Sequence, residues 1–496
     1  MNDGTPFYVT DSPPSLLLKI HRPARNAGDF RLCGGKGEGL GKGSAPLLFA
    51  AIAAFVVSWS VTIAFAQDAQ EVPFTLDRAI EVAIERNSLI KAAVEKQKAA
   101  IEELKGARAD FFLKASATYS YTVLKDKPYV RLEGIQVDIA DNDQYHWDVT
   151  LSQPLFTGFA LSTKYKMAEI GIDVKDTEKD QAVLDVVKEV KVAYFNILLT
   201  KKFLLVADET VRQLESHVRD AEKFYAQAMI AYNDLLKPKV ALAGAVQNRV
   251  KAESNVEMAI SAFNTVLQMD LNRKIDVEDI LGITPSPYNL GTLIKEAMEK
   301  RPELKAVRLA MGHIDYAVRL AQSSYYPEVH LMGSYEQNGQ NPEATENDYS
   351  NTHNASISIE AKWTFFEWGK TRADVSKYRR QKRSLAEKLR WIEDSIKLEV
   401  KNAFLNLKVA EKNIQTAKES LVQAKENWRI TNLQYQQQMT TSTEVLDART
   451  FLTQAETNYY GALYGYMIAL AEVERSAGKR WKGRLAGKQS AKNEGM

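Results

Sequence analysis

The sequence predicts a mainly α-helical protein with a membrane β component, built as a tandem duplication of a helix–strand–strand–long helix repeat. Three observations predict this fold class. The two halves of the chain match each other in order, which indicates an internal repeat. Short segments alternate between polar and apolar residues, as half-buried strands do. Long stretches almost free of proline and glycine carry apolar residues at helical spacing.

The duplication is visible residue by residue. Residues 76–112 align without gaps on 290–326, so that Phe111-Phe112 falls on Tyr325-Tyr326. Further on, residues 189–197 match 399–407. The chain therefore divides into an N-terminal extension with a signal peptide (1–66), a first repeat (67–275), a linker (276–289), a second repeat (290–478) and a basic tail expected to be disordered (479–496).

The extension carries one strongly apolar segment, Ala45 to Ala66, after a basic stretch. It closes with Ala64-Phe65-Ala66, a small-x-small pattern that predicts signal-peptidase cleavage before Gln67. An uncleaved membrane anchor is the alternative, because about 20 apolar residues can span a bilayer. The single cysteine, Cys33, precedes the segment, so the processed chain would hold no disulfide.

Each repeat begins with a helical stretch of about 35 residues, at 76–110 and at 290–323. Two strand-like segments follow in each repeat, separated by a polar loop. Their residues alternate between an apolar and a polar face, as transmembrane strands do between lipid and lumen. A half-buried sheet in a soluble protein would show the same alternation. The segments are 113–123 and 147–152 in the first repeat, and 329–336 and 355–365 in the second.

A long helix ends each repeat and is broken once near its middle. From Leu161 to about Tyr232 there is no proline and one glycine, Gly171. Some 70 helical residues would span about 100 Å. Apolar residues recur at heptad spacing, which predicts a coiled-coil seam. The seam positions are Val211, Leu214, Val218, Ala221, Tyr225, Ala228 and Tyr232, and the second repeat has Leu421, Ala424, Trp428 and Tyr435.

Four membrane strands cannot close a barrel, and an open sheet edge is not tolerated in lipid. The strand number therefore predicts an oligomer. Three copies would supply a trimeric 12-strand β-barrel, and the long helices would continue it as an α-helical barrel about 100 Å deep.

Several short motifs in their order resemble the TolC-like outer-membrane efflux protein family over residues 72–478. They include Arg301-Pro302-Glu303-Leu304, Tyr326-Pro327-Glu328-Val329, Leu155-Phe156-Thr157-Gly158, Phe365-Phe366-Glu367-Trp368-Gly369 and Glu444-Val445-Leu446-Asp447-Ala448-Arg449. The resemblance implies a homotrimer in the lipid of the cell outer membrane, with a long periplasmic extension. It also implies two partners, a periplasmic adaptor (membrane fusion) protein and an inner-membrane transporter.

The resemblance also assigns roles to the breaks in the long helices. In the family these turns form the periplasmic tip at which the adaptor docks. Family members usually have glycine where Ala228 and Gln438 stand, so the turn conformation is an open question. Two ordinary helix–helix turns are the alternative reading. The predicted docking residues are Ala228, Met229, Asn233, Gln438, Met439, Thr440 and Thr441.

A pair of carboxylates follows the second turn. Glu444 and Asp447 are three residues apart and so face one side of a helix. In a trimer they would place a ring of negative charge at the periplasmic aperture, favouring cations. Thr441 to Glu444 also fits a capping box, in which Glu444 only caps the helix. Tyr435 matches a family position in the links that hold the aperture closed, and Thr440 replaces the family's nearby basic partner.

The sequence gives no indication of an enzyme, a cofactor or a bound metal. Its six histidines have no metal-ligand spacing, and it contains no phosphate-binding glycine loop and no GxSxG motif. The net charge after Ala66 is zero, which does not favour nucleic-acid binding. The predicted function is a passive outer-membrane duct that exports small molecules such as drugs and toxic compounds for a tripartite efflux system. A type I protein secretion duct and an exported coiled-coil scaffold are the alternatives.

Overall fold

The computed structural model describes residues 73–280 and 288–481, and every structural statement here refers to them. The predicted signal peptide, with its cleavage site at Ala64, Ala66 and Gln67, lies outside these residues. None of the helices in the described ranges combines the length and the hydropathy that a membrane-spanning helix needs.

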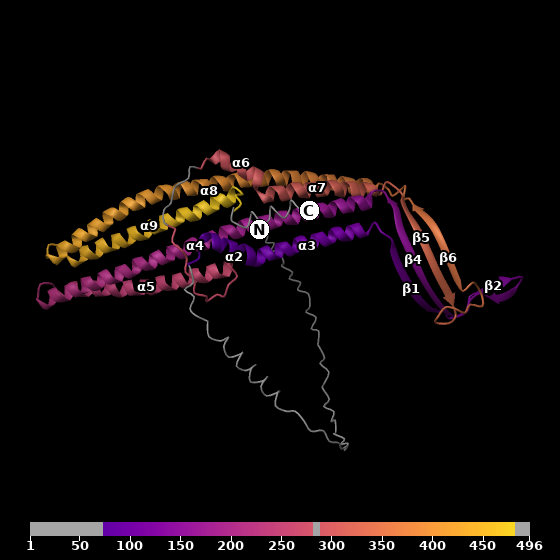
Figure 1. Cartoon of the computed structure of the whole chain (residues 1–496), viewed down its shortest axis with the longest axis horizontal. Helices are drawn as coiled ribbons and strands as arrows, with labels where there is room; N and C mark the ends of the chain where they lie inside the picture. The colour runs from indigo at the N-terminus through magenta and orange to yellow at the C-terminus, as the bar shows by residue number, and fades with distance from the viewer. Residues whose placement is uncertain (1–72, 281–287, 482–496) are drawn as a thin grey trace, which may run out of the picture. The chain divides into compact units, whose positions relative to one another are not determined.

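The two repeats have the same order of elements, with one hairpin added to the first, and this confirms the predicted duplication (Figure 1). The first repeat contains α2 (Leu76–Arg86), α3 (Ser88–Ala109), β1 (Lys114–Val123), β2 (Tyr129–Leu132), β3 (Ile135–Asp138), β4 (Asp143–Thr157), α4 (Ala160–Ala226) and α5 (Tyr232–Val266). The second contains α6 (Leu290–Lys300), α7 (Pro302–Ser323), β5 (Glu328–Gly339), β6 (His353–Lys362), α8 (Lys370–Gln436) and α9 (Ser442–Ser476).

The first helical stretch of each repeat is broken, where the sequence pattern predicted one helix. The break falls at Asn87 and at Arg301, which are equivalent positions in the two repeats. Asn87 leaves the helical conformation and its Oδ1 accepts a hydrogen bond from Leu89 N, so it caps α3. Arg301 leaves the helix before Pro302, which stands at the first position of α7.

The helices lie side by side in four columns (Figure 1). α4 packs against α3 and α5 on one side and against α7 and α9 on the other, and α8 packs against α7 and α9. The column of α3 and α5 and the column of α8 are therefore the two free edges of the protomer.

Apolar side chains fill the region where the columns meet the short helices. One core surrounds Tyr194 and Phe263, and the Tyr194 hydroxyl donates to the carbonyl oxygens of Phe74 or Glu278 at 2.9 and 2.6 Å. The second core lies around Leu293, Leu304 and Val400 in the other repeat. The duplicated sequence thus builds two equivalent cores.

The four predicted strand segments form one antiparallel sheet in the order β1-β4-β5-β6. Opposed residues share a face, and the register places most apolar side chains on one face and most polar side chains on the other. One face carries Ala117, Tyr119, Trp147, Val149, Leu151, Leu331, Tyr335, Ile357 and Ile359. The other carries Ser116, Thr118, Asp148, Thr150, Ser334, Glu336, Ser356, Ser358 and Glu360.

The sequence pattern missed one element, the hairpin of β2 and β3, which lies in the region expected to be a polar loop. Its two-residue turn is Glu133-Gly134, and both residues have positive φ, at 51° and 89°. Asn-Gly is the usual sequence of such a turn. The sequence pattern did not reveal this turn because glutamate stands in the first position in place of asparagine.

The predicted heptad seam is confirmed in part. Val211, Leu214, Val218 and Ala221 are buried in the first repeat. Tyr225 and Tyr232 are exposed instead, and their rings pack on each other across the turn with centroids 5.5 Å apart. In the second repeat Tyr435 is buried, while Leu421, Ala424 and Trp428 are only half-buried.

Candidate functional site

The two breaks in the long helices adopt the same turn. After α4, the Met229 amide donates to the Phe224 carbonyl at 2.9 Å and the Ala228 amide to Tyr225 at 2.9 Å. After α8, Met439 and Gln438 repeat the pattern with Gln434 and Tyr435 at 2.8 and 2.9 Å. This pair of bonds is the Schellman motif, which satisfies the last carbonyls of a helix.

The motif requires one residue in the left-handed conformation. Ala228 has φ 56° and Gln438 has φ 61° at that position. Glycine adopts this conformation without a steric cost, whereas other residues lose about 1 kcal/mol. Ala228 and Gln438 therefore form the turn without glycine, and each places a side chain on it.

The two turns differ in how the next helix begins. Thr441 is the N-cap of α9, and its Oγ1 accepts a hydrogen bond from Glu444 N at 3.4 Å. Ala231 holds the same position before α5 and offers no side-chain acceptor. The Thr441 half of the predicted capping box is therefore present in the second repeat alone.

The two turns lie together. The Gln438 side-chain amide donates to the Met229 sulfur at 3.1 Å, and Lys237 Nζ donates to Thr443 Oγ1 at 3.3 Å. Thr440 is half-buried and the other predicted docking residues are exposed. The structure thus brings together Ala228, Met229, Asn233, Gln438, Met439, Thr440 and Thr441, the whole set that the sequence predicted.

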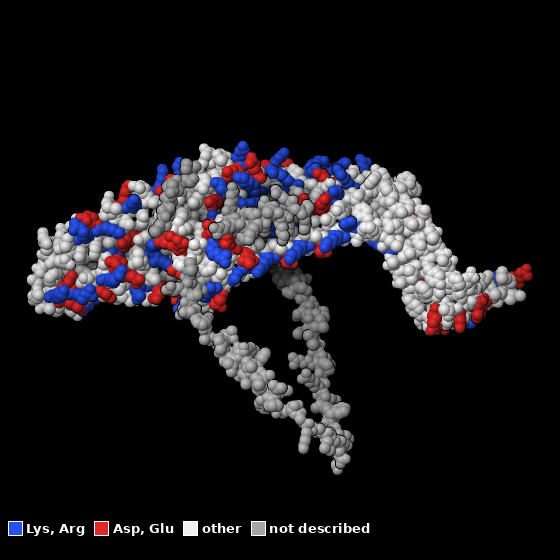
Figure 2. Space-filling model, viewed as in Figure 1, with Lys and Arg blue, Asp and Glu red and all other residues white. Residues whose placement is uncertain are grey.

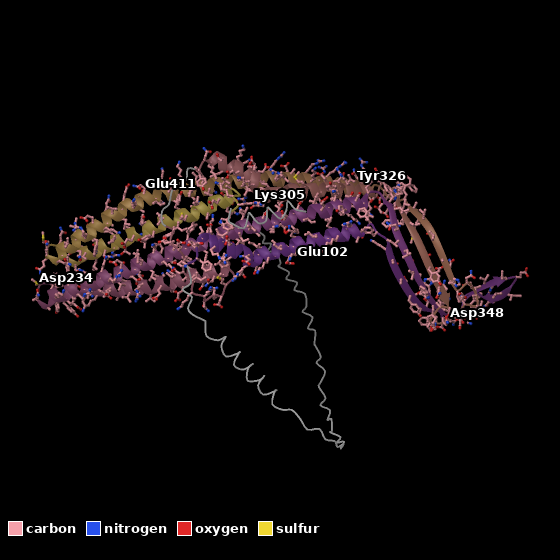
Figure 3. All side chains as sticks on the ribbon, viewed as in Figure 1. Glu102, Asp234, Lys305, Tyr326, Asp348 and Glu411 are labelled. Atoms are coloured by element: carbon pink, nitrogen blue, oxygen red, sulfur yellow. The ribbon has the colours of Figure 1, made fainter. Side chains whose placement is uncertain are left out.

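Charge near the turns is asymmetric. Asp234, labelled in Figure 3, pairs with Lys237 at 3.2 Å. Glu444 and Asp447 are exposed in the first turns of α9, and neither makes an ion pair with any residue in the described ranges. Two uncompensated carboxylates per protomer therefore lie beside the turns.

Tyr435 lies in a buried cluster rather than at the surface. Its ring packs on His217 and on Phe224, with centroids 4.6 and 5.5 Å away. His217 Nε2 lies 2.8 Å from Ser442 Oγ, which joins α4 to the first residue of α9. The cluster therefore ties the two helix hairpins together next to the turns.

Burial sets the protonation of this cluster. It lowers the pKa of His217 to about 4, against a smaller opposing effect of Asp220, so the imidazole is neutral at neutral pH. His217 Nδ1 is buried without a hydrogen-bond partner among the described residues. Burial likewise raises the pKa of Tyr435.

Sequence reasoning did not identify His217 as part of the site. One indication was available, since His217 directly precedes the seam residue Val218 and so lies at the margin of the apolar stripe.

The sheet supplies the second functional surface. Figure 2 shows it as a band without charge, bounded by Lys and Arg toward the helices and by Asp and Glu toward the far loops, where Figure 3 labels Asp348. The few charged side chains inside the band, such as Asp148, Glu336 and Glu360, lie on the polar face. One face thus suits lipid and the other water.

Comparison with known proteins adds a family to this geometry. A family model described as "Outer membrane efflux protein" matches residues 79–267 and 293–479. The outer membrane protein TolC of Escherichia coli (strain K12) is 21% identical over 329 residues, which cover 64% of this chain and 66% of TolC, just under two thirds of it. TolC of Salmonella enteritidis is 21% identical over 402 residues, covering 79% of each protein.

Solved structures show the same fold. The Campylobacter jejuni CmeC outer membrane channel superposes with a TM-score of 0.71 at 15% identity, covering 84% of this chain and 89% of CmeC.

Proposed function

Because the chain belongs to the outer membrane efflux protein family, and is thus an outer-membrane protein with a long periplasmic helical extension, we propose that three copies form a passive export duct. The family is one of efflux proteins rather than of enzymes. The duct carries small molecules from the periplasm to the exterior, and an inner-membrane transporter, reached through a periplasmic adaptor, supplies the energy.

The two-faced sheet is the observation that carries the proposal. Its edge strands β1 and β6 each pair on one side only, and its apolar face is exposed or half-buried in the protomer, with Ile357 at 84%. Unpaired strand edges are not tolerated in lipid, so neighbouring copies must cover them. Three sheets make twelve strands, with the polar face turned to the lumen.

The free edges of the helices support the same ring. On α8, large apolar residues lie exposed at heptad spacing on the side opposite to the buried Val400 and Leu407. On α5, exposed apolar residues that lie within about 80° of one another form a second stripe, opposite to the buried Ala245 and Phe263. The stripes are Trp391, Leu398, Leu405 and Val409 on α8, and Leu236, Val240, Val250 and Met258 on α5.

The stripes on α5 and α8 are two different surfaces, so the contact between neighbouring copies is heterologous. Such a contact closes a ring only if the rotation from one copy to the next is a whole fraction of a full turn. The two stripes lie at matching distances from the turns. Val409 lies 27 residues before the end of α8 at Gln436, and Met258 lies 26 residues after the start of α5 at Tyr232. The turns at these ends touch each other, so Val409 of one copy lies at the level of Met258 of the next when the copies share one ring axis.

The long helices, the turns and the exposed carboxylates each have a role in the proposed duct. α4 and α8 each have 67 residues and span about 100 Å. The exposed turn residues, Met229 and Met439 foremost, offer the adaptor a docking surface at the periplasmic tip. Glu444 and Asp447 of three copies line the aperture with negative charge, beside the buried Tyr435 cluster.

Disulfide cross-linking in outer membranes tests the ring. In a Cys33→Ser background, Val409→Cys with Met258→Cys should yield covalent dimers and trimers and no larger species. Lys408→Cys with Met258→Cys is the matched control, because Lys408 neighbours Val409 but lies about 100° around the helix. Equal trimer yields from both pairs, or no covalent trimer from the first, would refute the arrangement.

A further inference from the structure

A cavity of about 510 Å³ lies at the helical end of the sheet, between the start of α4 and the end of α7. Its lining includes Phe159, Lys166, Tyr316, Arg319 and Tyr326. Figure 3 labels Tyr326 where α7 gives way to the strands. The cavity lies far along the helices from the turns, and the duct proposed above gives it no role.

Aromatic contacts join this cavity to the apolar face of the sheet. Phe156 in β4 is paired with Val329, which belongs to that face. Its ring meets Phe159 edge to face at 5.4 Å, and Phe159 meets Tyr326 in the same way at 5.8 Å. The cavity therefore opens on the side of the sheet that faces lipid.

Phe159 and Tyr326 remain 61% and 49% exposed in the protomer. Aromatic residues of this kind form a girdle at the membrane interface of β-barrels. Their position places the cavity at the level of lipid headgroups.

The polar part of the cavity is basic. The Arg319 guanidinium lies 5.1 Å from the centre of the Tyr316 ring, and no carboxylate within the described ranges pairs with it. Lys166 contributes a second cation, shared with Glu169 at 2.7 Å.

The neighbouring start of α8 adds to this charge. Residues 370–383 contain seven Lys or Arg and a single acid, Asp374. Two of these cations, Lys370 and Arg372, stand in the first turn of α8, where the helix dipole disfavours them. Figure 2 shows Lys and Arg gathered over α7 and α8 next to the uncharged band.

We propose that this cavity binds an anionic phospholipid of the periplasmic leaflet, one per protomer. The phosphate is held by Arg319 and Lys166, the headgroup lies among Phe159, Tyr316 and Tyr326, and an acyl chain follows the apolar face past Phe156. An unpaired guanidinium beside exposed aromatic rings recognises a phosphate at an interface. The inference rests on the proposed function, because that function places the apolar face in lipid.

The test counts lipids bound to the purified full-length trimer by native mass spectrometry during titration with phosphatidylglycerol or phosphatidylcholine. The wild type should retain up to three phosphatidylglycerol molecules and fewer phosphatidylcholine molecules. Arg319→Gln should weaken phosphatidylglycerol binding about fivefold, the effect of one basic residue at an anionic membrane surface. Arg308→Gln is the matched control, since Arg308 lies eleven residues earlier on the same face of α7, away from the cavity.

Three outcomes would overturn the proposal. The first is equal retention by Arg319→Gln and Arg308→Gln, and the second is equal binding of the two lipids by the wild type. The third is full displacement of the lipid by inorganic phosphate, which would show a site for a free anion. A sample that is trimeric and conducts ions in planar bilayers keeps the duct proposal intact in each case, whereas a monomer without conductance contradicts the duct itself.

Discussion

His217 is 3% exposed and lies between a helix seam and the second turn, with Nε2 on Ser442 and Nδ1 without a partner among the described residues. Folding holds its pKa at about 4, below the ordinary value of 6.5. Its contribution to stability is therefore fully present above pH 6.5 and is lost as the pH falls toward 4, because the unfolded chain binds the proton first.

We expect the free energy of unfolding to fall by about 2 kcal/mol per protomer between pH 7 and pH 5 through this residue. Denaturant titrations of the detergent-solubilised protein at the two pH values measure it. His217→Gln should flatten this dependence, and His313→Gln, on the half-buried face of α7, should not. An unchanged pH dependence in His217→Gln would rule out this role.

Arg301 shows why the second repeat breaks its first helix. Its guanidinium is buried and bonds Glu303 at 2.9 and 3.0 Å, Glu399 at 3.0 and 2.9 Å and the Ser476 carbonyl at 3.1 Å. Burial raises the pKa of Glu303, but the charges of Arg301 and Arg475 outweigh it and hold the pKa below its ordinary value. The network joins α7, α8 and the end of α9.

Arg301→Met should lower the free energy of unfolding by about 3–5 kcal/mol, because it leaves the half-buried Glu303 with a partly uncompensated charge. Chemical denaturation checks the value. Arg308→Gln, an exposed arginine on the same helix, should change it by less than about 0.5 kcal/mol. Similar effects of the two substitutions would contradict the assignment of the network.

Single residues were the hardest level to predict. The two repeats share positive φ at equivalent positions, yet glycine stands in at most one member of each pair. Gly158 is required, since an added Cβ would lie 2.5 Å from the Ser323 carbonyl oxygen, whereas its counterpart Trp368 adopts the same conformation with a large side chain. The pairs are Gly158 and Trp368, Phe159 and Gly369, Ala228 and Gln438, and Gln268 and Gly478.

Helices and strands were largely predictable because their periodicity is strong. The segments 113–123 and 355–365 agree closely with β1 and β6, whereas α4 ends at Ala226, six residues before the predicted seam ends at Tyr232. The breaks at Asn87 and Arg301 were missed, because each is compensated by distant partners, Val266 for Asn87 and Glu399 for Arg301. Such partners are not visible in a local pattern.

The two turns make a matched experiment on capping. Thr441→Ala removes the side-chain acceptor before α9 and should lower the free energy of unfolding by about 1 kcal/mol. Ala231→Thr should raise it by a similar amount, since Ala231 and Thr441 have nearly the same backbone angles, φ −73° and −90° with ψ 155° and 159°. Denaturation midpoints of both variants measure the pair, and a destabilising Ala231→Thr would count against equivalent caps.

In the assembled ring, we expect the ion selectivity of the candidate aperture to depend on the charged side chains that line it. Glu444→Gln with Asp447→Asn keeps the Thr441 cap, which uses the backbone amide of residue 444, and removes two charges per protomer. We expect the cation preference of the channel in planar bilayers to fall. Asp234→Asn, which loses a charge already paired with Lys237, should alter it less. Unchanged selectivity in the double variant would leave these carboxylates no role beyond the helix start.

The sequence predicts the assembly only because one chain supplies too few strands to close a barrel. Four strands with an apolar face require partners, and that follows from strand number alone. The exposed stripes on α5 and α8 were not recognised, because an apolar heptad position reads the same whether it is buried within a copy or between copies. The lipid-side cavity escaped notice for a similar reason, since Arg319 and Lys166 lie on different repeats.

The mass of the complex extracted from outer membranes in mild detergent tests the central claim most directly. Native mass spectrometry or light scattering with correction for detergent gives the number of copies. We predict three, consistent with a closed twelve-strand barrel continued by helices. A stable monomer in that fraction, with its sheet edges uncovered, would contradict the duct.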